Sequence, residues 1–437
     1  MSIIIYGMDE NIRVALEKQN PWWFDKPFDT GIERLRYYPS ILKYLEVPEI
    51  LLLAGARRTG KSTLLYQVIK HLIEIKNISS RSILFINLDE PLFQSKSEDP
   101  AFLSRVVGEY SSENQETRLY LFIDEIQNYD YWVQTTKILF DTQKNIKIIL
   151  TGSTSTLLKG AITTNLAGRC LSMRVYPLSF QEYMDFRGVK KPTILEKKQE
   201  FETYLKFGAF PRVVLERDER IKQDILKNYF QTIYLKDIIY PHNLRSNRDV
   251  FDLLYFLISN VGRLLSYSKI ARILNISVDT VKEYIEYAEE SYLISSITKF
   301  DHSIKKQMAN PKKIYCLDTG LVNSVSFKFS ENRGWLLENL AYTTLSRQEP
   351  DVYYHREKYE CDFLIKDNLK IRQAIQVAAS LMDEKTRKRE IKGLLEAMKS
   401  HGIKVGSLIT EDGGKEIHAG GKTIAVKQFY EWVMEKV

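Results

Sequence analysis

The chain has 437 residues, a length that suits about three domains of ordinary size. Hydrophobic residues make up 44% and charged residues 27%, which is typical of a folded globular protein and excludes a disordered chain. The net charge of +7, from 63 basic and 56 acidic residues, permits nucleic-acid binding but does not require it. Because no apolar run approaches the roughly 18 residues of a membrane span, we expect no membrane partner.

The N-terminus and the cysteines indicate the compartment. Residues 1–6 lack the basic region and the long apolar core of a signal peptide. Cys170, Cys316 and Cys361 are widely spaced and form neither a metal-binding pattern nor an even set for disulfides. Both features predict a cytoplasmic protein.

The first predicted segment, residues 1–30, holds a short helix and an aromatic cluster at residues 21–24. Packing as core is the favoured interpretation of this cluster. Covering a bound ligand is the alternative. Residues 31–180 follow as a predicted α/β domain.

Residues 55–62 read Gly-Ala-Arg-Arg-Thr-Gly-Lys-Ser and match the phosphate-binding pattern G-x-x-x-x-G-K-[ST]. An apolar run at 50–54 precedes them and an amphipathic stretch at 61–75 follows, which predicts the strand–loop–helix context of a nucleotide site. Glycines let backbone N–H groups close around phosphates, and the helix N-terminus adds a positive dipole. We expect Lys61 to reach the β- and γ-phosphates of ATP and Ser62 to ligate Mg²⁺. The predicted nucleotide contacts in this region are Gly55, Ala56, Arg57, Arg58, Thr59, Gly60, Lys61, Ser62 and Thr63.

A second motif lies at residues 118–125, an apolar strand that ends in Asp124 and Glu125. Asp124 suits a Mg²⁺ contact at the carboxyl end of a parallel strand, and Glu125 suits the base that activates the attacking water. The strand at 82–88 lies between the two motifs in the chain, so we expect one strand to be inserted between them in the sheet. The next strand, 146–151, runs into Ser153, which we expect to contact the γ-phosphate and the water as a sensor of hydrolysis.

Helical periodicity with few glycines predicts a helical lid at residues 181–245, ending in a turn-rich break at 241–246. Residues 268–274 and 278–288 then predict a helix-turn-helix, and the alternating stretch 292–300 predicts a wing strand. Residues 246–330 are therefore interpreted as a winged helix.

The predicted winged helix carries an acidic second helix, with Asp279, Glu283 and Glu286 against Lys282. DNA contact is therefore expected at the wing rather than at this helix, because phosphates require basic partners. The wing residues are Lys305, Lys306, Lys312 and Lys313, with His302 nearby. A winged helix kept for protein packing is the alternative.

Residues 331–437 resemble a restriction-endonuclease-like core, with a helix at 335–341 and strands at 352–355, 360–365 and 374–378. The resemblance places Asp362 at the first metal position and Glu338 at the helix acid. Gln376 and Ala378 stand where the resemblance expects an acid and a lysine, so we predict a nuclease fold without nuclease activity. The basic stretch 385–389 is interpreted either as a phosphate contact or as a solvated helix face.

The order of elements resembles the AAA-superfamily ATPases of archaea and bacteria that carry a winged helix and a restriction-endonuclease-like domain. The segments that carry the resemblance are 20–23, 55–62, 124–125, 151–153, 168–169, 176–180 and 207–211. The resemblance implies an α/β fold with a P-loop AAA-type parallel sheet, and a homo-oligomer such as a hexameric ring. It also implies that Arg169 acts as an arginine finger across a subunit boundary and that Arg212 is a sensor arginine in the lid.

These features together predict an oligomeric ATPase that uses ATP and Mg²⁺ to bind or remodel DNA, with branched DNA such as a Holliday junction as one substrate. An ATP-regulated nuclease is one alternative and would need an intact metal site at Glu338 and Asp362. A nucleotide-switched signalling or scaffold protein with protein partners is the other.

Overall fold

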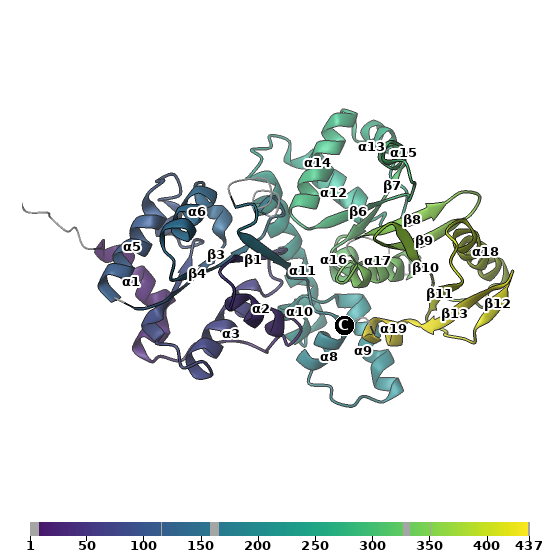
Figure 1. The fold of residues 1–437 in the computed structure, drawn as a ribbon. Coiled ribbons are helices and arrows are strands. Elements are labelled where there is room, and N and C mark those ends of the chain that lie inside the picture. Colours follow the sequence, from purple (N-terminus) through teal and green to yellow (C-terminus); the bar gives the residue numbers. More distant parts are fainter. Residues whose placement is uncertain (1–7, 115, 158–165, 327–332, 350, 436–437) are drawn as a thin grey trace, which may run out of the picture. The chain divides into compact units, whose positions relative to one another are not determined.

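The computed structural model describes residues 8–114, 116–157, 166–326, 333–349 and 351–435 (Figure 1). These residues form two compact units, 1–175 and 176–437, each of which is described by itself. The predicted boundary at 330–331 and the N-terminal residues 1–6 lie outside the described ranges.

The first unit contains a five-stranded sheet in which every neighbouring pair is parallel, in the order β2-β3-β4-β1-β5. The strands are β1 (Ile50–Ala54), β2 (Ile83–Asn87), β3 (Leu119–Asp124), β4 (Ile146–Gly152) and β5 (Cys170–Arg174). β1, β3 and β4 are buried along their whole length, as expected for apolar strands covered on both faces. The predicted α/β fold with a parallel sheet is confirmed.

The strand inserted between β1 and β3 is β4, whereas the sequence order indicated the strand that became β2. The chain crosses from β1 to the far edge, where it forms β2, and returns inward through β3. β4 then forms between β3 and β1, and its Leu150 pairs with Leu52 of β1. The prediction that one strand separates the two motifs holds, but the strand was identified wrongly.

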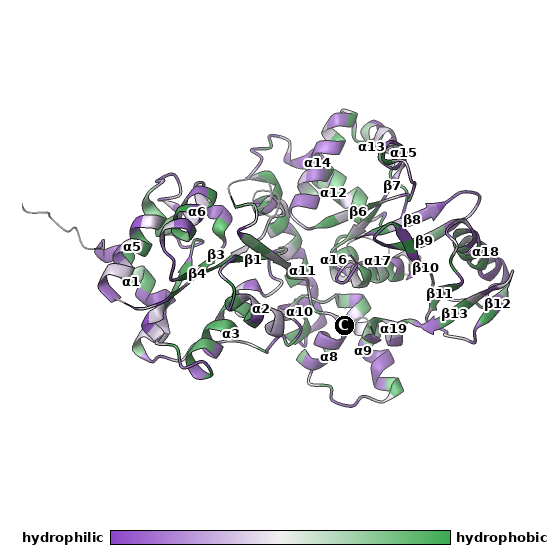
Figure 2. Ribbon diagram, viewed as in Figure 1, coloured by the Kyte–Doolittle hydropathy of each residue, from purple (hydrophilic) through white to green (hydrophobic). Residues whose placement is uncertain are grey.

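Helices cover the sheet of the first unit. They include α2 (Tyr38–Leu45), α3 (Lys61–Glu74), α4 (Pro91–Gln94), α5 (Phe102–Asn114) and α6 (Trp132–Thr142). In Figure 1, α2 and α3 lie below the sheet and α6 lies above it. α3 buries Leu64, Leu65, Val68 and Leu72, at the three-to-four-residue spacing of an amphipathic helix. Figure 2 shows β1 as hydrophobic and mixed colours along the helices around it.

The N-terminal segment, α1 (Glu10–Gln19) and the 3-10 turn Pro21–Phe24, closes the free edge of β2. Asn20 is fully buried and bonds both backbone groups of Phe85, accepting from its N–H at 2.7 Å and donating to its carbonyl at 2.8 Å. Trp23 Nε1 donates to the Ile83 carbonyl at 2.8 Å. Because an unpaired strand edge invites association with other chains, these side chains protect the sheet. Trp22 and Trp23 of the aromatic cluster therefore pack as core, as predicted, whereas Phe24 is exposed.

The second unit begins with a helical region: α8 (Phe180–Phe186), α9 (Ile194–Phe207), α10 (Pro211–Leu215), α11 (Glu219–Ile233) and a π-helical stretch at Tyr234–Ile239. It continues with α12 (Asn247–Ile258), α13 (Tyr267–Leu274), α14 (Val278–Glu290), and a hairpin of β6 (Ile294–Thr298) and β7 (Lys312–Cys316) around α15 (Ile304–Ala309). This element order is the one expected for a lid followed by a winged helix, and both assignments stay predictions.

The rest of the second unit is a six-stranded mixed sheet in the order β12-β13-β11-β10-β9-β8. Its elements, after α16 (Thr319–Val325), are α17 (Arg333–Leu345), β8 (Val352–Arg356), β9 (Glu360–Asp367), β10 (Lys370–Ala378), α18 (Glu384–Ser400), β11 (Val405–Thr410), β12 (Ile417–Ala419), β13 (Lys422–Gln428) and α19 (Phe429–Glu435). The β6–β7 hairpin is joined to this sheet, because Phe300 N donates to the Tyr354 carbonyl at 2.9 Å and Tyr354 OH donates to the Pro311 carbonyl.

The burial of Asn20 gives a stability prediction. Asn20→Leu should lower the free energy of unfolding by about 2 to 4 kcal/mol, since it leaves the buried N–H and C=O of Phe85 without partners. Denaturant unfolding of the whole chain measures this. Asn11→Leu, on the exposed side of α1, is the control and should change stability by less than about 0.5 kcal/mol. Equal effects of the two substitutions would mean that the segment does not hold the edge of β2.

Candidate nucleotide site and the C-terminal acidic pocket

The loop at residues 55–60 joins the end of β1 to the start of α3, so it presents its backbone at the carboxyl edge of the sheet. A Cβ at Gly55 would lie 2.2 Å from the Val175 carbonyl oxygen, so only glycine fits there. Gly60 has a φ of +93° and begins α3, a conformation that favours glycine. The remaining predicted contacts Ala56, Arg57, Arg58, Thr59 and Thr63 lie in this loop and in the first turn of α3.

Lys61 lies inside the loop with its side chain almost fully buried. Its Nζ donates to the carbonyls of Gly55 at 2.9 Å and Ala56 at 3.0 Å. It also lies 4.0 Å from Glu125 Oε1. The ammonium is thus held within the curve of the loop, the position from which a lysine reaches nucleotide phosphates.

Ser62 and Asp124 meet at the start of α3 and the end of β3. Ser62 Oγ donates to Asp124 Oδ2 at 2.7 Å, and Thr151 Oγ1 donates to the other carboxylate oxygen. Burial, followed by the charge of Glu125, raises the pKa of Asp124 to about 6, so the carboxyl is ionised at neutral pH. A hydroxyl and a carboxylate are the oxygen donors that Mg²⁺ prefers, so these two residues fit that ion.

Glu125 is held in an unusual backbone conformation directly after β3. Its φ is +56°, which is uncommon for a residue with a side chain, and its N–H donates to Thr151 Oγ1 at 3.0 Å. Burial alone would raise its pKa, but Lys61 and Arg57 outweigh burial and lower it. Glu125 is therefore an ionised carboxylate in a nearly dry site, which suits it to accept a proton from water.

Gln127 links Glu125 to the end of β4. Its Nε2 donates both to Glu125 Oε2 and to Ser153 Oγ, the latter at 3.1 Å. The predicted sensor Ser153 is fully buried. Through Gln127 it shares a hydrogen-bond network with Glu125, the predicted base. Sequence reasoning gave no role to Gln127, and none to Thr151, although Thr151 lies in a segment that carries the family resemblance. The only signal was their position beside the two motifs, at the carboxyl ends of β3 and β4.

The two predicted arginines each form an ion pair within their own unit. Arg169 precedes β5, at the amino end of β1, where Ile50 N donates to the Arg169 carbonyl at 2.8 Å. β1 has five residues and is therefore about 17 Å long. Arg169 lies at the amino end of this strand, whereas the phosphate loop of the same chain lies at its carboxyl end. Its guanidinium pairs with Asp141 at 3.2 Å. Arg212 belongs to the second unit, on α10, and pairs with Glu216 at 3.0 Å.

The second unit contains a cavity of about 820 Å³ beside β9, β10, α17 and α18. Its acidic lining residues are Glu338, Glu360, Asp362, Asp383 and Glu390, and its basic ones are Arg356, Lys358 and Arg389. The cavity brings together Glu338, Asp362 and Gln376, the residues that the sequence predicted for the nuclease-like site. Sequence reasoning did not identify Glu360 or Glu390. Glu360 is the first residue of β9 and Glu390 lies on α18, and neither belongs to a recognisable motif.

Lys313 fills the acidic end of this site, which corrects its predicted place on a DNA-binding wing. Only 1% of its side chain is exposed, and its Nζ lies 2.8 Å from Glu338, 2.7 Å from Glu360 and 3.3 Å from Asp362. Neighbouring residues of a strand point to opposite faces, so Lys312 and Lys313 cannot both face outward. The carboxylates raise the pKa of Lys313 despite burial, so the ammonium stays charged and is engaged inside the protein.

Gln376 is buried and lines the same pocket. Its Nε2 donates to Asp362 Oδ2 at 2.8 Å and to Glu390 Oε2 at 2.6 Å. Burial, followed by the charge of Glu338, raises the pKa of Asp362 to about 7. The nuclease-like pattern expects a metal-ligating acid at position 376. The structure instead has the amide nitrogen of Gln376 there, which donates to Asp362 and Glu390.

Three comparisons place the chain among known proteins. Residues 47–184 match the family model of an AAA domain, and residues 198–332 match a domain of unknown function, DUF8612. An uncharacterised protein of Methanocaldococcus jannaschii, MJ1544, is 35% identical over 80% of this chain and 79% of its own length. An uncharacterised protein of Haemophilus influenzae is 30% identical over 77% of this chain and 84% of its own length.

Among solved structures, the Aeropyrum pernix ORC2 protein in its ADPNP–ADP complexes is similar over 69% of this chain and 95% of that one. The identity is 11% and the TM-score 0.41, which is too low to carry an argument about function. In the described part of the chain, no helix is both long and apolar enough to cross a membrane. By its identity to these two relatives the chain belongs to the same family as MJ1544 and the Haemophilus influenzae protein, and its residues 47–184 match an AAA domain.

Proposed function

We propose that this protein is a Mg²⁺-dependent ATPase that acts as an oligomer and couples hydrolysis to the binding or remodelling of DNA. The observation that carries the proposal is the convergence of three groups at one sheet edge. Lys61 lies in the phosphate loop, Ser62 bonds Asp124 at 2.7 Å, and Glu125 lies 4.0 Å from Lys61. A cation, an oxygen pair for Mg²⁺ and an ionised base are the parts that phosphoryl transfer to water requires.

Each residue has a separate task in this mechanism. Lys61 neutralises phosphate charge when ATP binds, while Ser62 and Asp124 would hold Mg²⁺, which supplies further charge stabilisation at the phosphates. Glu125 accepts the proton of the attacking water, and Gln127 fixes the orientation of its carboxylate by a hydrogen bond. Ser153 joins the same network from the end of β4.

The separation of tasks predicts two different variants. Lys61→Ala should abolish ATP binding, because the loss removes charge neutralisation in the ground state. Glu125→Gln should keep ATP bound and lower kcat by about 100-fold or more, because the carboxylate acts only on water in the transition state. Equilibrium binding of labelled ATP and steady-state phosphate release measure the two effects.

Lys70→Ala, an exposed position on the same helix, is the control and should leave both measurements unchanged. Hydrolysis by Glu125→Gln at the rate of the unchanged protein would remove Glu125 from the mechanism.

We also propose that Arg169 serves the site of a neighbouring subunit. Its place at the amino end of β1 keeps it from its own phosphate loop, so any role in catalysis requires a second copy. Its bond to Asp141 is exposed at the surface, and such pairs contribute about 0 to 1 kcal/mol to stability, so Asp141 does not hold it strongly.

Mixing experiments test this assignment. Arg169→Ala should reduce ATP turnover by about 10³-fold without weakening ATP binding. Mixing it with Glu125→Gln should partly restore turnover, since one subunit supplies the arginine and the other an intact base. Asp141→Ala is the matched control: it removes one ion-pair partner of Arg169 and should leave turnover close to normal. A mixture that co-assembles but stays inactive would contradict the assignment in trans.

The C-terminal nuclease-like domain is proposed not to cut nucleic acid. Metal-dependent hydrolysis needs carboxylates that are free to hold metal ions. In this pocket the Lys313 ammonium already pairs with Glu338, Glu360 and Asp362, and Gln376 donates to Asp362. A second candidate, the ATP-regulated nuclease, is therefore disfavoured by the same contacts.

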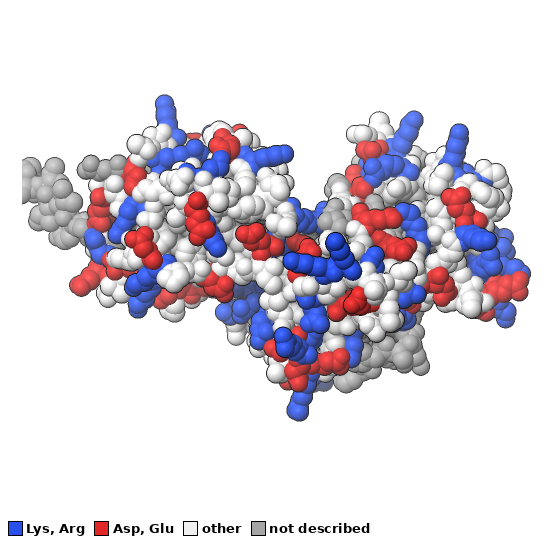
Figure 3. All heavy atoms as spheres, turned by 90° about the horizontal axis from the view of Figure 1, so that it is seen from below, with Lys and Arg blue, Asp and Glu red and all other residues white. Residues whose placement is uncertain are grey.

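For DNA, the burial of Lys313 leaves Lys305, Lys306 and Lys312 as the proposed phosphate contacts, of which the first two are exposed on α15. Basic and acidic side chains are interspersed on the face drawn in Figure 3, so this face offers no broad surface of one sign. Binding through Lys305, Lys306 and Lys312 alone would involve few phosphate contacts, so its salt dependence would be modest.

We predict that the protein binds forked or four-way DNA and leaves it uncut in Mg²⁺ or Mn²⁺, with or without ATP. Neutralising Lys305, Lys306 and Lys312 to Gln should reduce the slope of log K against log salt by about three units at most, one for each lost phosphate contact. Fluorescence anisotropy at several salt concentrations and a gel assay for cleavage are the measurements.

A charge-matched control replaces Lys190, Lys191 and Lys198, which are exposed in the helical region of the same unit. It should leave the salt slope unchanged. Cleavage that disappears with Asp362→Ala would establish the nuclease alternative, and absence of DNA binding would favour the scaffold alternative.

A further inference from the structure

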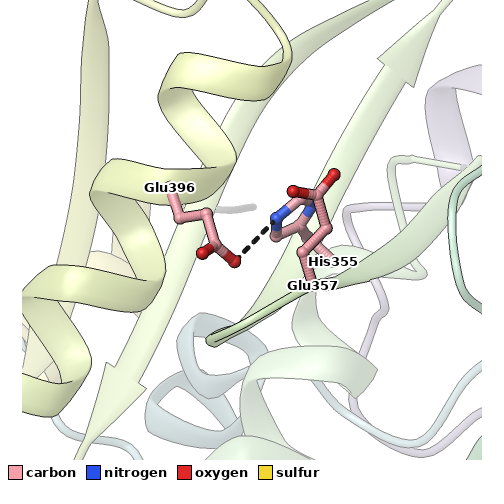
Figure 4. A group of neighbouring side chains, drawn as sticks. All are labelled: His355, Glu357 and Glu396. Carbon is pink, nitrogen blue, oxygen red and sulfur yellow. Dashed lines mark ion pairs between the residues drawn. The ribbon is translucent and has the colours of Figure 1, made fainter.

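His355 lies near the end of β8 and is not among the residues that line the cavity. Only 2% of its surface is exposed. Figure 4 shows Glu396 of α18 and Glu357, just after β8, close to its ring. One ligand atom from each of the three residues lies within 4.8 Å of the others.

The hydrogen bonding of His355 is incomplete. Its Nε2 is buried without a hydrogen-bond partner, although it lies 3.4 Å from Glu396 Oε1. Its Nδ1 lies 3.3 Å from Nε2 of His401. A neutral imidazole carries one N–H, so a proton donated from Nδ1 to His401 leaves a bare lone pair on Nε2. Glu396 Oε1 lies 3.4 Å from this nitrogen, and Glu357 completes the group of three, so a cation placed among them would satisfy all three groups.

We propose that His355 Nε2, Glu396 and Glu357 bind a divalent transition-metal ion of the zinc class. One imidazole nitrogen and two carboxylate oxygens are a ligand set that Zn²⁺ accepts, with water in the fourth position. The imidazole selects against Mg²⁺ and Ca²⁺, which take oxygen ligands almost exclusively.

The surroundings orient the ligands as a metal site requires. A ligating histidine donates its other ring N–H to an outer partner, and His401 Nε2 is placed to accept that bond from His355 Nδ1. Glu396 Oε1 accepts the backbone N–H of Tyr359 at 3.0 Å, which fixes the second ligand.

A metal here would tie the β8–β9 turn to α18. Both ends of the link belong to the mixed sheet and its covering helix, so binding would stabilise the folded second unit by mass action. The competing explanation is a proton in place of the metal, with a charged His355 paired to Glu396.

Metal binding by the full-length protein distinguishes the two explanations. After EDTA treatment and gel filtration, Zn²⁺ binding is measured by titration calorimetry, and Co²⁺ is used as a spectroscopic substitute. Glu357→Gln and Glu396→Gln each remove one charged ligand with little change of shape. Glu384→Gln removes an exposed carboxylate from the first turn of α18 and is the matched control.

The unchanged protein and Glu384→Gln should bind one more Zn²⁺ per chain than Glu396→Gln, or bind it at least tenfold more tightly. Zn²⁺ should raise the melting temperature of the unchanged protein and of Glu384→Gln, and should have little effect on that of Glu396→Gln. The Co²⁺ complex should show visible d–d absorption that both ligand variants lose. Metals held at Asp124 or Asp362 are common to all variants and cancel in these differences.

Equal Zn²⁺ stoichiometry, affinity and thermal shift in all four proteins would overturn the proposal, as would the absence of any bound metal. Melting in EDTA shows whether each variant folds. Glu357 is exposed, so Glu357→Gln keeps the test valid if Glu396→Gln does not fold.

Discussion

A buried ammonium group must be matched by carboxylates or carbonyls, and this constraint organises both units of the protein. Removing a lysine from water is costly unless its charge is compensated by partners in good geometry. In the first unit, Lys61 is compensated by two carbonyls of its own loop and by Glu125 from the end of β3. In the second, Lys313 is compensated by carboxylates from α17 and β9. In both places the requirement joins elements that are distant in the chain.

The two lysines differ in what their partners leave available. Lys61 is held mainly by neutral carbonyls, which phosphate oxygens can outcompete because they carry full negative charge. Lys313 is held by three carboxylates, which already supply more negative charge than the ammonium needs. The first arrangement is therefore prepared for an anionic ligand, whereas in the second the Lys313 ammonium already pairs with the carboxylates that a metal ion would use. A buried lysine thus forms part of a binding site in the first unit, whereas in the second unit the lysine ammonium takes the place of a metal cation.

The sequence predicted the first site well because its chemistry follows the chain. A phosphate loop is contiguous, and Asp124 and Glu125 come directly after a buried strand, so parallel pairing alone brings them to the loop. Long-range pairings left no such signal. Nothing in the run Lys312-Lys313 shows that Glu338, Glu360 and Asp362 surround the second lysine, and the alternation of a strand decides which of the two faces inward. The edge protection by Asn20 and the Gln127 bridge were missed for the same reason: single polar side chains become informative only when their partners are known.

The β8–β9 turn and α18 connect the two polar clusters of the second unit. Glu357 and Glu360 flank one turn, the first beside His355 and the second on Lys313. α18 likewise directs Glu390 to Gln376 and the following Glu396 to His355. Because the same turn and the same helix serve both clusters, a cation bound at His355 would fix the backbone that positions Glu360 and Glu390. The charge balance around Lys313 would then depend on a cation that does not contact Lys313. This coupling follows because the acids of the two clusters are closely spaced on the same turn and the same helix.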